Sequence, residues 1–169
     1  MGCSNSKTVD SLNSPDLGIG SLKESLFERL FNTETIKELS KNAFVSVLNK
    51  YPEAKKIFNV PETTKTNSEL LGTKEVQVAS DKLLNHYIDI IKTTDSNVDS
   101  AVQKKAEELN KLGVKAEYIK CYGENLAQNA VKDLGDQLSL TEEKTLKTVT
   151  NEITNQLTTE MGKLPESSS

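Results

Sequence analysis

The chain has 169 residues and a formal net charge of −4, from 21 Lys and Arg against 25 Asp and Glu residues. A chain of this length forms one domain and can bury roughly 70% of its unfolded surface. Its basic residues are dispersed, which excludes the concentrated positive surface of a nucleic-acid-binding protein. No apolar run approaches the roughly 18 residues of a membrane-spanning helix, and no signal-peptide core follows the start.

The first residues carry a lipidation motif. The segment Met1-Gly2-Cys3-Ser4-Asn5-Ser6 matches the N-myristoylation pattern, which makes Gly2 the acylated residue after removal of Met1. Cys3 beside it is a natural S-palmitoylation site, and two acyl chains are needed for stable attachment because one binds only marginally. The alternative is a free tail that begins Met-Gly by chance. Residues 1–20 are predicted to be an acylated flexible tether, since 8–20 are polar and rich in Pro and Gly.

From residue 21 onward, apolar residues recur at helical spacing and no alternating pattern of a strand appears. A capping-box spacing at Ser21 starts the first helix, and a polar segment with Pro and Gly, 61–73, is expected to be a loop. A short helical turn after Pro52 is expected to leave Ile57 and Phe58 buried. The other helices are predicted at 35–50, 76–91, 98–111, 115–134 and from Thr141 to about Met161. The sequence therefore predicts an all-α fold.

The spacing around the second helix and the turn after it resembles that of globins. Residues 44–58 read FVSVLNKYPEAKKIF, with Pro52 six residues before Phe58. Globins carry a proline at the start of the C helix and, six residues later, a phenylalanine that packs on haem. Phe44 lies eight residues before the proline, where globins place a large residue that lines the distal pocket.

A second segment, 106–124, reads AEELNKLGVKAEYIKCYGE and resembles the globin region that contains the proximal histidine and ends in Gly-Val. The resemblance covers residues 22–163 and looks closest to the divergent globins of nematodes. It implies a globin-like fold of about seven to eight helices in a domain at 21–163. Residues 164–169 are predicted to be a disordered tail.

The two haem-facing histidines of globins are absent. The resemblance puts Ala79 at the distal position and Leu109 at the proximal position, and the chain contains one histidine, His86. Leucine has no lone pair, so it cannot replace the histidine that holds haem iron. His86 lies two turns beyond Ala79 on nearly the same helix face, which makes it a possible ligand of a displaced haem. The alternative is a partly buried histidine satisfied by a carboxylate or backbone group.

Three other side chains near the proximal segment belong to types that can bind haem iron: Tyr118, Cys121 and Tyr122. Each would require a haem displaced from its usual position. The alternative is a buried cysteine and two core tyrosines with hydrogen-bond partners, which is the commoner arrangement.

The resemblance also implies which residues line the space that haem occupies in a globin: Phe44, Phe58, Ala79, Leu83, Val102, Ala106 and Leu109. Three outcomes remain open from the sequence. The helices close over this space, or an apolar cavity remains and takes a ligand such as a fatty acid, or haem is held by hydrophobic contact and a weak ligand.

We therefore expect a membrane-anchored, globin-like protein without a cofactor, on the cytosolic face of a membrane, with the plasma membrane as the expected one. Two cysteines do not make a disulfide framework, which agrees with the cytosol. Its expected role is that of an apolar-ligand sensor or a protein-interaction and signalling module, with the protein partner not specified.

No enzyme signature is present: there is no HExxH motif and no Gly-rich phosphate loop behind a strand, and one histidine cannot serve a recognisable Ser-His-Asp order. The alternative function is a membrane-bound haem globin with unusual ligation, in oxygen sensing or redox signalling. A third class is a structural or antigenic scaffold.

Overall fold

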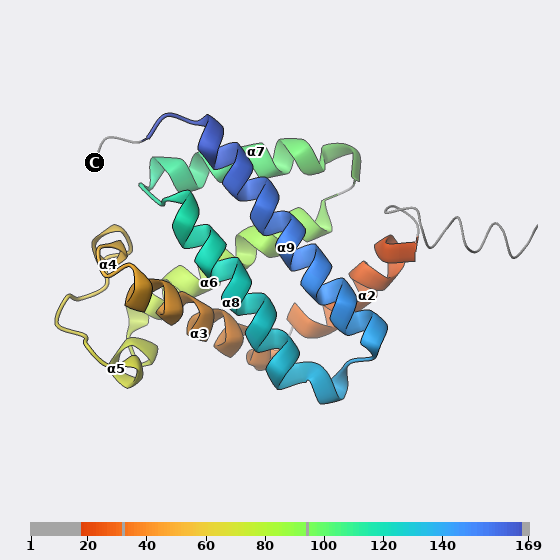
Figure 1. The fold of residues 1–169 in the computed structure, drawn as a ribbon, viewed down its shortest axis with the longest axis horizontal. Coiled ribbons are helices and arrows are strands. Elements are labelled where there is room, and N and C mark those ends of the chain that lie inside the picture. Colours follow the sequence, from red (N-terminus) through yellow and green to blue (C-terminus); the bar gives the residue numbers. More distant parts are fainter. Residues whose placement is uncertain (1–17, 32, 94, 167–169) are drawn as a thin grey trace, which may run out of the picture.

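The computed structural model describes residues 18–31, 33–93 and 95–166. Within these ranges the chain forms eight α-helices and no β-strand (Figure 1). The all-α, globin-like fold of seven to eight helices predicted from the sequence is confirmed. None of the helices in the described ranges is both long enough and apolar enough to cross a bilayer.

The helices follow one another with short connections. They are α2 (Gly18–Phe31), α3 (Glu34–Lys50), α4 (Ala54–Ile57), α5 (Asn67–Leu71), α6 (Lys74–Lys92), α7 (Val98–Lys111), α8 (Ala116–Leu134) and α9 (Leu140–Lys163). Two 3-10 turns, η1 (Asp95–Asn97) and η2 (Gly135–Gln137), precede α7 and follow α8.

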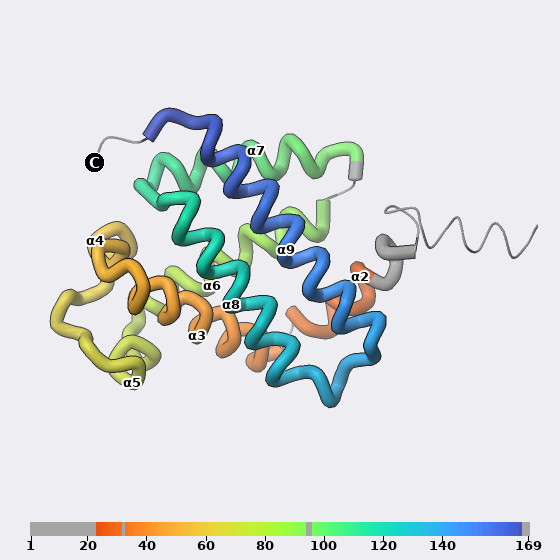
Figure 2. The backbone as a smooth tube through the Cα atoms, viewed as in Figure 1, coloured from red at the N-terminus to blue at the C-terminus, as the bar shows by residue number. Residues whose placement is uncertain are grey.

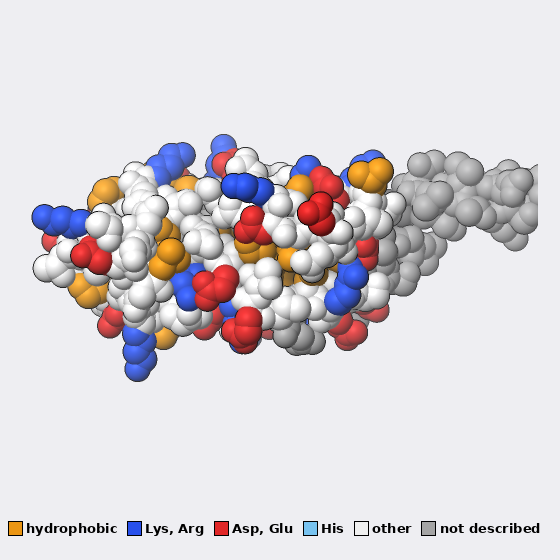
Figure 3. Space-filling model, turned by 90° about the horizontal axis from the view of Figure 1, so that it is seen from below, with side chains coloured by type: hydrophobic (Ala, Val, Ile, Leu, Met, Phe, Trp, Pro, Cys, Tyr) orange, Lys and Arg blue, Asp and Glu red, His pale blue; other side chains and the backbone are white. Residues whose placement is uncertain are grey.

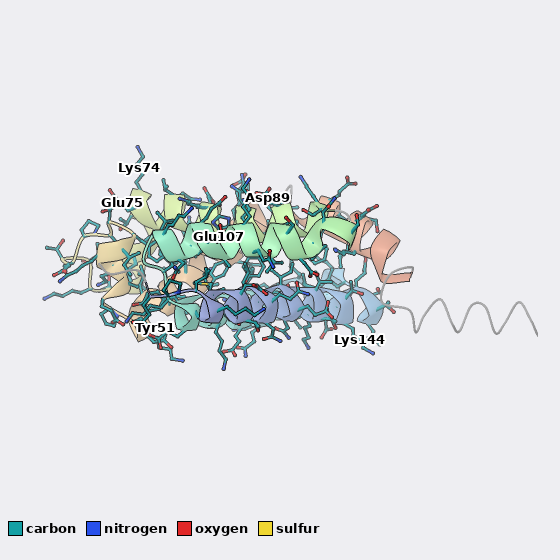
Figure 4. The ribbon with its side chains drawn as sticks, turned by 90° about the horizontal axis from the view of Figure 1, so that it is seen from above. Tyr51, Lys74, Glu75, Asp89, Glu107 and Lys144 are labelled. Atoms are coloured by element: carbon teal, nitrogen blue, oxygen red, sulfur yellow. The ribbon has the colours of Figure 1, made fainter. Side chains whose placement is uncertain are left out.

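The long helices lie in two layers. Seen edge-on in Figure 4, α6 and α7 form one layer and α8 and α9 form the other. Helix α3 packs against both α6 and α8, and α7 packs against α9, so the layers are joined along their length. Figure 2 shows α4, α5 and the loop between them at one end of the molecule, with α2 and the turn from α8 to α9 at the other.

Local sequence determines where several helices begin and end. Thr33 accepts a hydrogen bond from the Ile36 backbone N–H and caps α3, and a full capping box of Ser139 and Glu142 starts α9. A Gly-Val pair, Gly113 and Val114, follows the C-cap of α7. Gly113 has φ 81°, a left-handed conformation that glycine adopts without penalty, and the Val114 N–H returns to the Leu109 carbonyl.

The loop predicted at 61–73 contains a short helix, α5, so that prediction is wrong in part. Thr66 accepts a hydrogen bond from the Glu69 backbone N–H, and the Glu69 carboxylate accepts one from the Thr66 N–H. This is a capping box, and its Thr-x-x-Glu spacing was readable from the sequence. The buried residue of this helix is Leu70, which attaches the segment to the core.

The boundaries of the domain extend beyond those predicted. Helix α2 begins at Gly18, inside the segment predicted to be a tether up to residue 20. At the other end, Leu164 packs half-buried on the core and the Pro165 carbonyl accepts a hydrogen bond from the Asn110 side chain, so the predicted tail at 164–169 begins too early. The remaining parts of the predicted tether and of the predicted tail, residues 1–17 and 167–169, lie outside the described residues.

Candidate functional site

The two residues to which the resemblance assigns the haem-ligand positions, Ala79 and Leu109, lie on α6 and α7, inside the core. Ala79 is 6% exposed and Leu109 is 1% exposed. Their side chains contain only carbon, and neither can donate a lone pair to a metal ion. The residues at these two positions therefore do not fit the axial ligation by which globins hold haem.

The side chains predicted to line the haem-sized space are packed rather than arranged around a cavity. Phe44 and Ala106 are 0% exposed, Val102 is 2% and Leu83 is 3%. Side chains buried to this extent leave little surface open to solvent or to an internal space. This packing favours, among the three outcomes left open by the sequence, the one with closed helices.

Phe58 departs from the prediction. It was expected to be buried together with Ile57, but both are half-buried on the short helix α4 and its C-cap. The Phe58 ring meets Phe44 edge-to-face, with ring centroids 4.8 Å apart and planes at 81°. An edge-to-face arrangement is energetically favourable for two aromatic rings. This contact packs the C-cap of α4 against α3 through the phenylalanine that the resemblance would place on haem.

A cleft of about 200 Å³ does lie beside one of the predicted lining residues, Val102, but it is located between α7 and α9. Its other lining residues are Asp99 from α7, and Asn155, Gln156, Thr159 and Glu160 from α9. Small-molecule sites commonly measure roughly 300–1,000 Å³. This cleft is smaller, and Val102 is the one predicted lining residue among its walls, so it differs from the cavity that the resemblance implies.

Two hydrogen-bonded pairs occupy the centre of the core. The Tyr122 hydroxyl lies 2.7 Å from Ser40 Oγ, and the Tyr87 hydroxyl lies 2.7 Å from Thr154 Oγ1. The two tyrosine rings meet edge-to-face at 5.6 Å, so the pairs form one unit that joins α3, α6, α8 and α9. Burial raises the pKa of both tyrosines far above the ordinary value. They are neutral hydroxyls.

The three residues considered as alternative iron ligands, Tyr118, Cys121 and Tyr122, have other roles in the core. The Tyr122 hydroxyl is bound to Ser40, and the Tyr118 hydroxyl donates to Glu53 at 3.2 Å. Burial and the adjacent Glu53 raise the pKa of Tyr118 to about 12. Cys121 is 6% exposed, and burial raises the pKa of its thiol, so its nucleophilic and metal-binding thiolate form is disfavoured.

His86 is buried at the contact between α6 and α7, with 5% of its surface exposed. Its Nδ1 lies 3.9 Å from Glu108 Oε2, which is within ion-pair range but too long for a hydrogen bond. Its Nε2 is buried and has no hydrogen-bond partner among the described residues. A carboxylate, that of Glu108, does lie beside Nδ1, as the alternative of a histidine satisfied by a carboxylate or backbone group expects, but Nε2 has no such group.

Burial, together with the nearby Lys105, favours the neutral form of the His86 ring. Burial lowers the pKa of His86 most, Lys105 lowers it further, and Glu108 acts in the opposite direction. Lys105 bridges the two helices, with its Nζ 3.0 Å from Asp89 Oδ2 on α6 and 3.6 Å from Glu108 Oε2 on α7. The histidine thus lies under an ion-pair network that closes the outer edge of this contact.

The described residues contain no group of three or more His, Cys, Asp or Glu side chains that could hold a metal ion. The chain matches no model of a known protein family, and no curated protein matches its sequence. The function must therefore be argued from its own residues. Two predicted site residues, Gly2 and Cys3, lie outside the described residues.

The sequence interpretation missed the central pairs of polar side chains. Ser40 and Thr154 appear in the sequence as ordinary helix-surface residues, yet both are almost completely buried. Their positions three or four residues from apolar neighbours on an inward face were the available signal. That signal is weak, because a buried hydroxyl needs a partner that only the packing of helices supplies.

Proposed function

We propose that this protein is a globin-like module without haem, held at the cytosolic face of a membrane by acyl groups on Gly2 and Cys3. Its role is to bind another protein in signalling rather than to carry or activate oxygen. The closed core is the observation that carries this proposal, because an oxygen-binding globin needs both an iron ligand and space for haem.

The identity of the core residues supports the loss of haem. Replacing an iron ligand by leucine removes the bond, and Leu109 is packed in the interior as an ordinary core residue. Three candidates for a displaced ligand are occupied or disfavoured: the hydroxyls of Tyr118 and Tyr122 have hydrogen-bond partners, and the Cys121 thiol has a raised pKa. The fourth candidate, His86, has a buried Nε2 without a partner among the described residues, but its ring is enclosed between α6 and α7.

The same packing favours an interaction module over a sensor of a fatty acid. A fatty acid needs an apolar cavity in which most of its surface is buried. The residues that would line one, including Phe44, Leu83 and Ala106, are packed at 3% exposure or less. A partner would therefore bind to the outer surface of the domain and not in an internal cavity.

Titration with haemin tests the haem-free function. The purified full chain is mixed with increasing haemin, and absorption spectra are recorded before and after reduction. We expect the spectrum of free haemin throughout. A sharp Soret band that shifts on reduction would overturn the proposal in favour of the haem globin with unusual ligation. Mass spectrometry of an organic extract provides the second arm, since a stoichiometric fatty acid would instead favour the sensor.

Membrane attachment is tested in cells by fractionation of the full chain and two variants. Gly2→Ala removes the acceptor for myristate, and Cys3→Ser removes the proposed palmitate. We expect the native chain in the membrane fraction, Gly2→Ala in the soluble fraction and Cys3→Ser divided between them, because one acyl chain gives marginal binding. An unchanged distribution of Gly2→Ala would contradict the anchoring.

A further inference from the structure

We propose that one end of the domain, where α2 begins and α9 begins, rests on the bilayer, with Leu140 inserted among the lipids and Lys144 at the phosphate groups. This inference rests on the acyl anchor proposed above and adds a defined orientation to it. We call this end, formed by the start of α2, η2 and the first turn of α9, the tether end.

The tether end is close to the proposed anchor along the chain. Fourteen residues lie between Cys3 and Gly18, where α2 begins, and a fully extended chain spans at most about 3.5 Å per residue, or about 50 Å in total. The start of α2 and the start of α9 lie at the same end of the long axis (Figure 1). An ion pair joins these helices, with Arg29 2.6 Å from Glu142. The proposed anchor therefore joins the domain at this end, and contacts of this end with the bilayer must set the orientation, because a tether of this length does not fix it by itself.

Leu140 is an unusual residue at this end. It is 86% exposed, compared with 57% for Val78 and 47% for Leu112, the other large hydrophobic side chains exposed among the described residues. The start of α9 does not require it, because the capping box uses Ser139 and Glu142. A leucine held outward by a rigid helix start has apolar surface to bury in a bilayer.

Lys144 lies one turn after Leu140, on the same face of α9. Figure 4 places it at the tether end, at the start of α9. A lysine beside an inserted apolar residue keeps its ammonium group at the level of the lipid phosphates. Leu140 and Lys144 thus have the order expected of an interfacial anchor.

Acidic side chains in the same turn are neutralised by partners. Glu142 pairs with Arg29, and Glu143 pairs with Lys147 at 3.1 Å. Asp136 on η2 is exposed nearby in the chain, so this end is not polybasic. The space-filling view from below shows acidic and basic side chains interspersed (Figure 3). The proposed contact therefore depends mainly on leucine insertion, with a smaller contribution from anionic lipid.

Vesicle binding tests the orientation. The full chain is prepared with myristate and with Cys3→Ser, so that its single acyl chain binds marginally and responds to added contacts. Leu140→Ser is compared with Leu112→Ser, a matched control near the C-terminal end of α7. We expect about tenfold weaker binding of Leu140→Ser to phosphatidylcholine vesicles and no change for Leu112→Ser. Equal binding of the two variants would overturn the inference.

Lys144→Gln provides the test of the charge. We expect weaker binding of this variant only when vesicles contain phosphatidylserine, by about twofold to fivefold, because one lysine near an anionic surface contributes modestly. Equal loss with both kinds of vesicle would contradict the placement of the ammonium group at the phosphates.

A fluorescent probe locates the leucine directly. In the Cys3→Ser background, Leu140→Cys and Leu112→Cys carry an environment-sensitive dye. We expect a blue shift on vesicles for the probe at position 140 and none at position 112. The alternative is that Leu140 contacts a second copy of this chain, which sedimentation without vesicles tests. A dimer that is lost in Leu140→Ser would assign Leu140 to that contact and overturn the inference.

The intact mass of the purified chain distinguishes a failure of the proposed acyl anchor from a failure of the proposed orientation. A chain that receives no myristate would contradict the anchor and thus the proposed function. An acylated chain that binds vesicles with no dependence on Leu140 would contradict the orientation alone.

Discussion

Gly123 on α8 lies directly against Thr154 on α9. A β-carbon at this position would overlap the Thr154 hydroxyl and lie 2.8 Å from the hydroxyl oxygen of Tyr87. The absence of a side chain at Gly123 therefore allows α8 and α9 to approach and lets the Tyr87–Thr154 hydrogen bond form beneath them.

We predict that Gly123→Ala destabilises the protein by about 1–3 kcal/mol, because the methyl group must displace a buried, hydrogen-bonded side chain rather than a flexible end. Urea unfolding measures the free energy of unfolding. Gly162→Ala is the matched control, since a β-carbon there would meet no atom within 4 Å. The control should be neutral or slightly stabilising, as expected for alanine in place of a helical glycine. A Gly123→Ala protein as stable as the control would show that the helices shift freely.

The Ser40–Tyr122 pair predicts unequal effects of two conservative substitutions. Ser40 Oγ donates to the Ser80 carbonyl at 2.9 Å, so Tyr122 supplies the hydrogen of its bond with Ser40. Ser40→Ala leaves the Tyr122 hydroxyl buried without its partner, which costs about 1–3 kcal/mol. Tyr122→Phe leaves Ser40 bound to Ser80 and should cost less.

The double variant completes the cycle for this pair. Adding Tyr122→Phe to Ser40→Ala should recover part of the lost stability, because no hydroxyl is then left without a partner. Strictly additive losses in the free energy of unfolding would argue that the two side chains do not interact.

Restoring a histidine at the proximal position should not restore haem binding. In Leu109→His, the imidazole replaces a fully buried apolar side chain, and we expect a loss of about 1–3 kcal/mol in stability. The space for haem remains filled by residues such as Phe44 and Ala106. The haemin titration should thus give the same spectrum for the variant and the native chain. A new Soret band in the variant alone would mean that the core opens readily for haem.

His86 predicts a pH dependence of stability with a defined sign. Its pKa is lowered in the folded state from the ordinary value of 6.5, so the unfolded chain binds the proton more readily. The contribution of the neutral histidine is complete above pH 6.5 and is lost progressively as the pH falls toward the folded-state pKa.

The measurement is urea unfolding of the native chain and His86→Leu between pH 7.5 and 5. The Lys105 network remains in the variant, and other carboxylates titrate equally in both proteins, so their difference isolates the histidine. We expect the native chain to lose more stability than His86→Leu on acidification. Parallel curves would mean that the ring titrates identically in both states.

Cys121 should be protected from thiol reagents. In Cys3→Ser, where it is the one remaining cysteine, burial and the raised pKa of its thiol both slow the reaction. We expect labelling by a maleimide in native buffer to be on the order of 100-fold slower than in denaturing urea, because reaction requires an opening of the core. Similar rates in both solvents would place the thiol at an accessible surface.

The all-α fold and most helix boundaries follow from the amino-acid sequence without any tertiary information. Helical spacing of apolar residues predicted α7 at Val98–Lys111 and α8 within one residue of its observed start, because each helix must present one apolar face to the core. The sequence also showed that residue 109, to which the resemblance assigns the proximal position, is a leucine and not a histidine.

Whether a cavity lies around Leu109 depends on the packing of the helices, which is a property of the tertiary structure. The small residues Ala79 and Ala106 left room in the sequence interpretation, but their burial depends on how closely α3, α6, α7 and α8 approach one another. The same holds for the Tyr87–Thr154 bond, which joins residues 67 positions apart and forms because Gly123 lets their helices meet. Helical periodicity is a property of neighbours along the chain, whereas cavities and buried polar pairs arise from distances between helices that only packing sets.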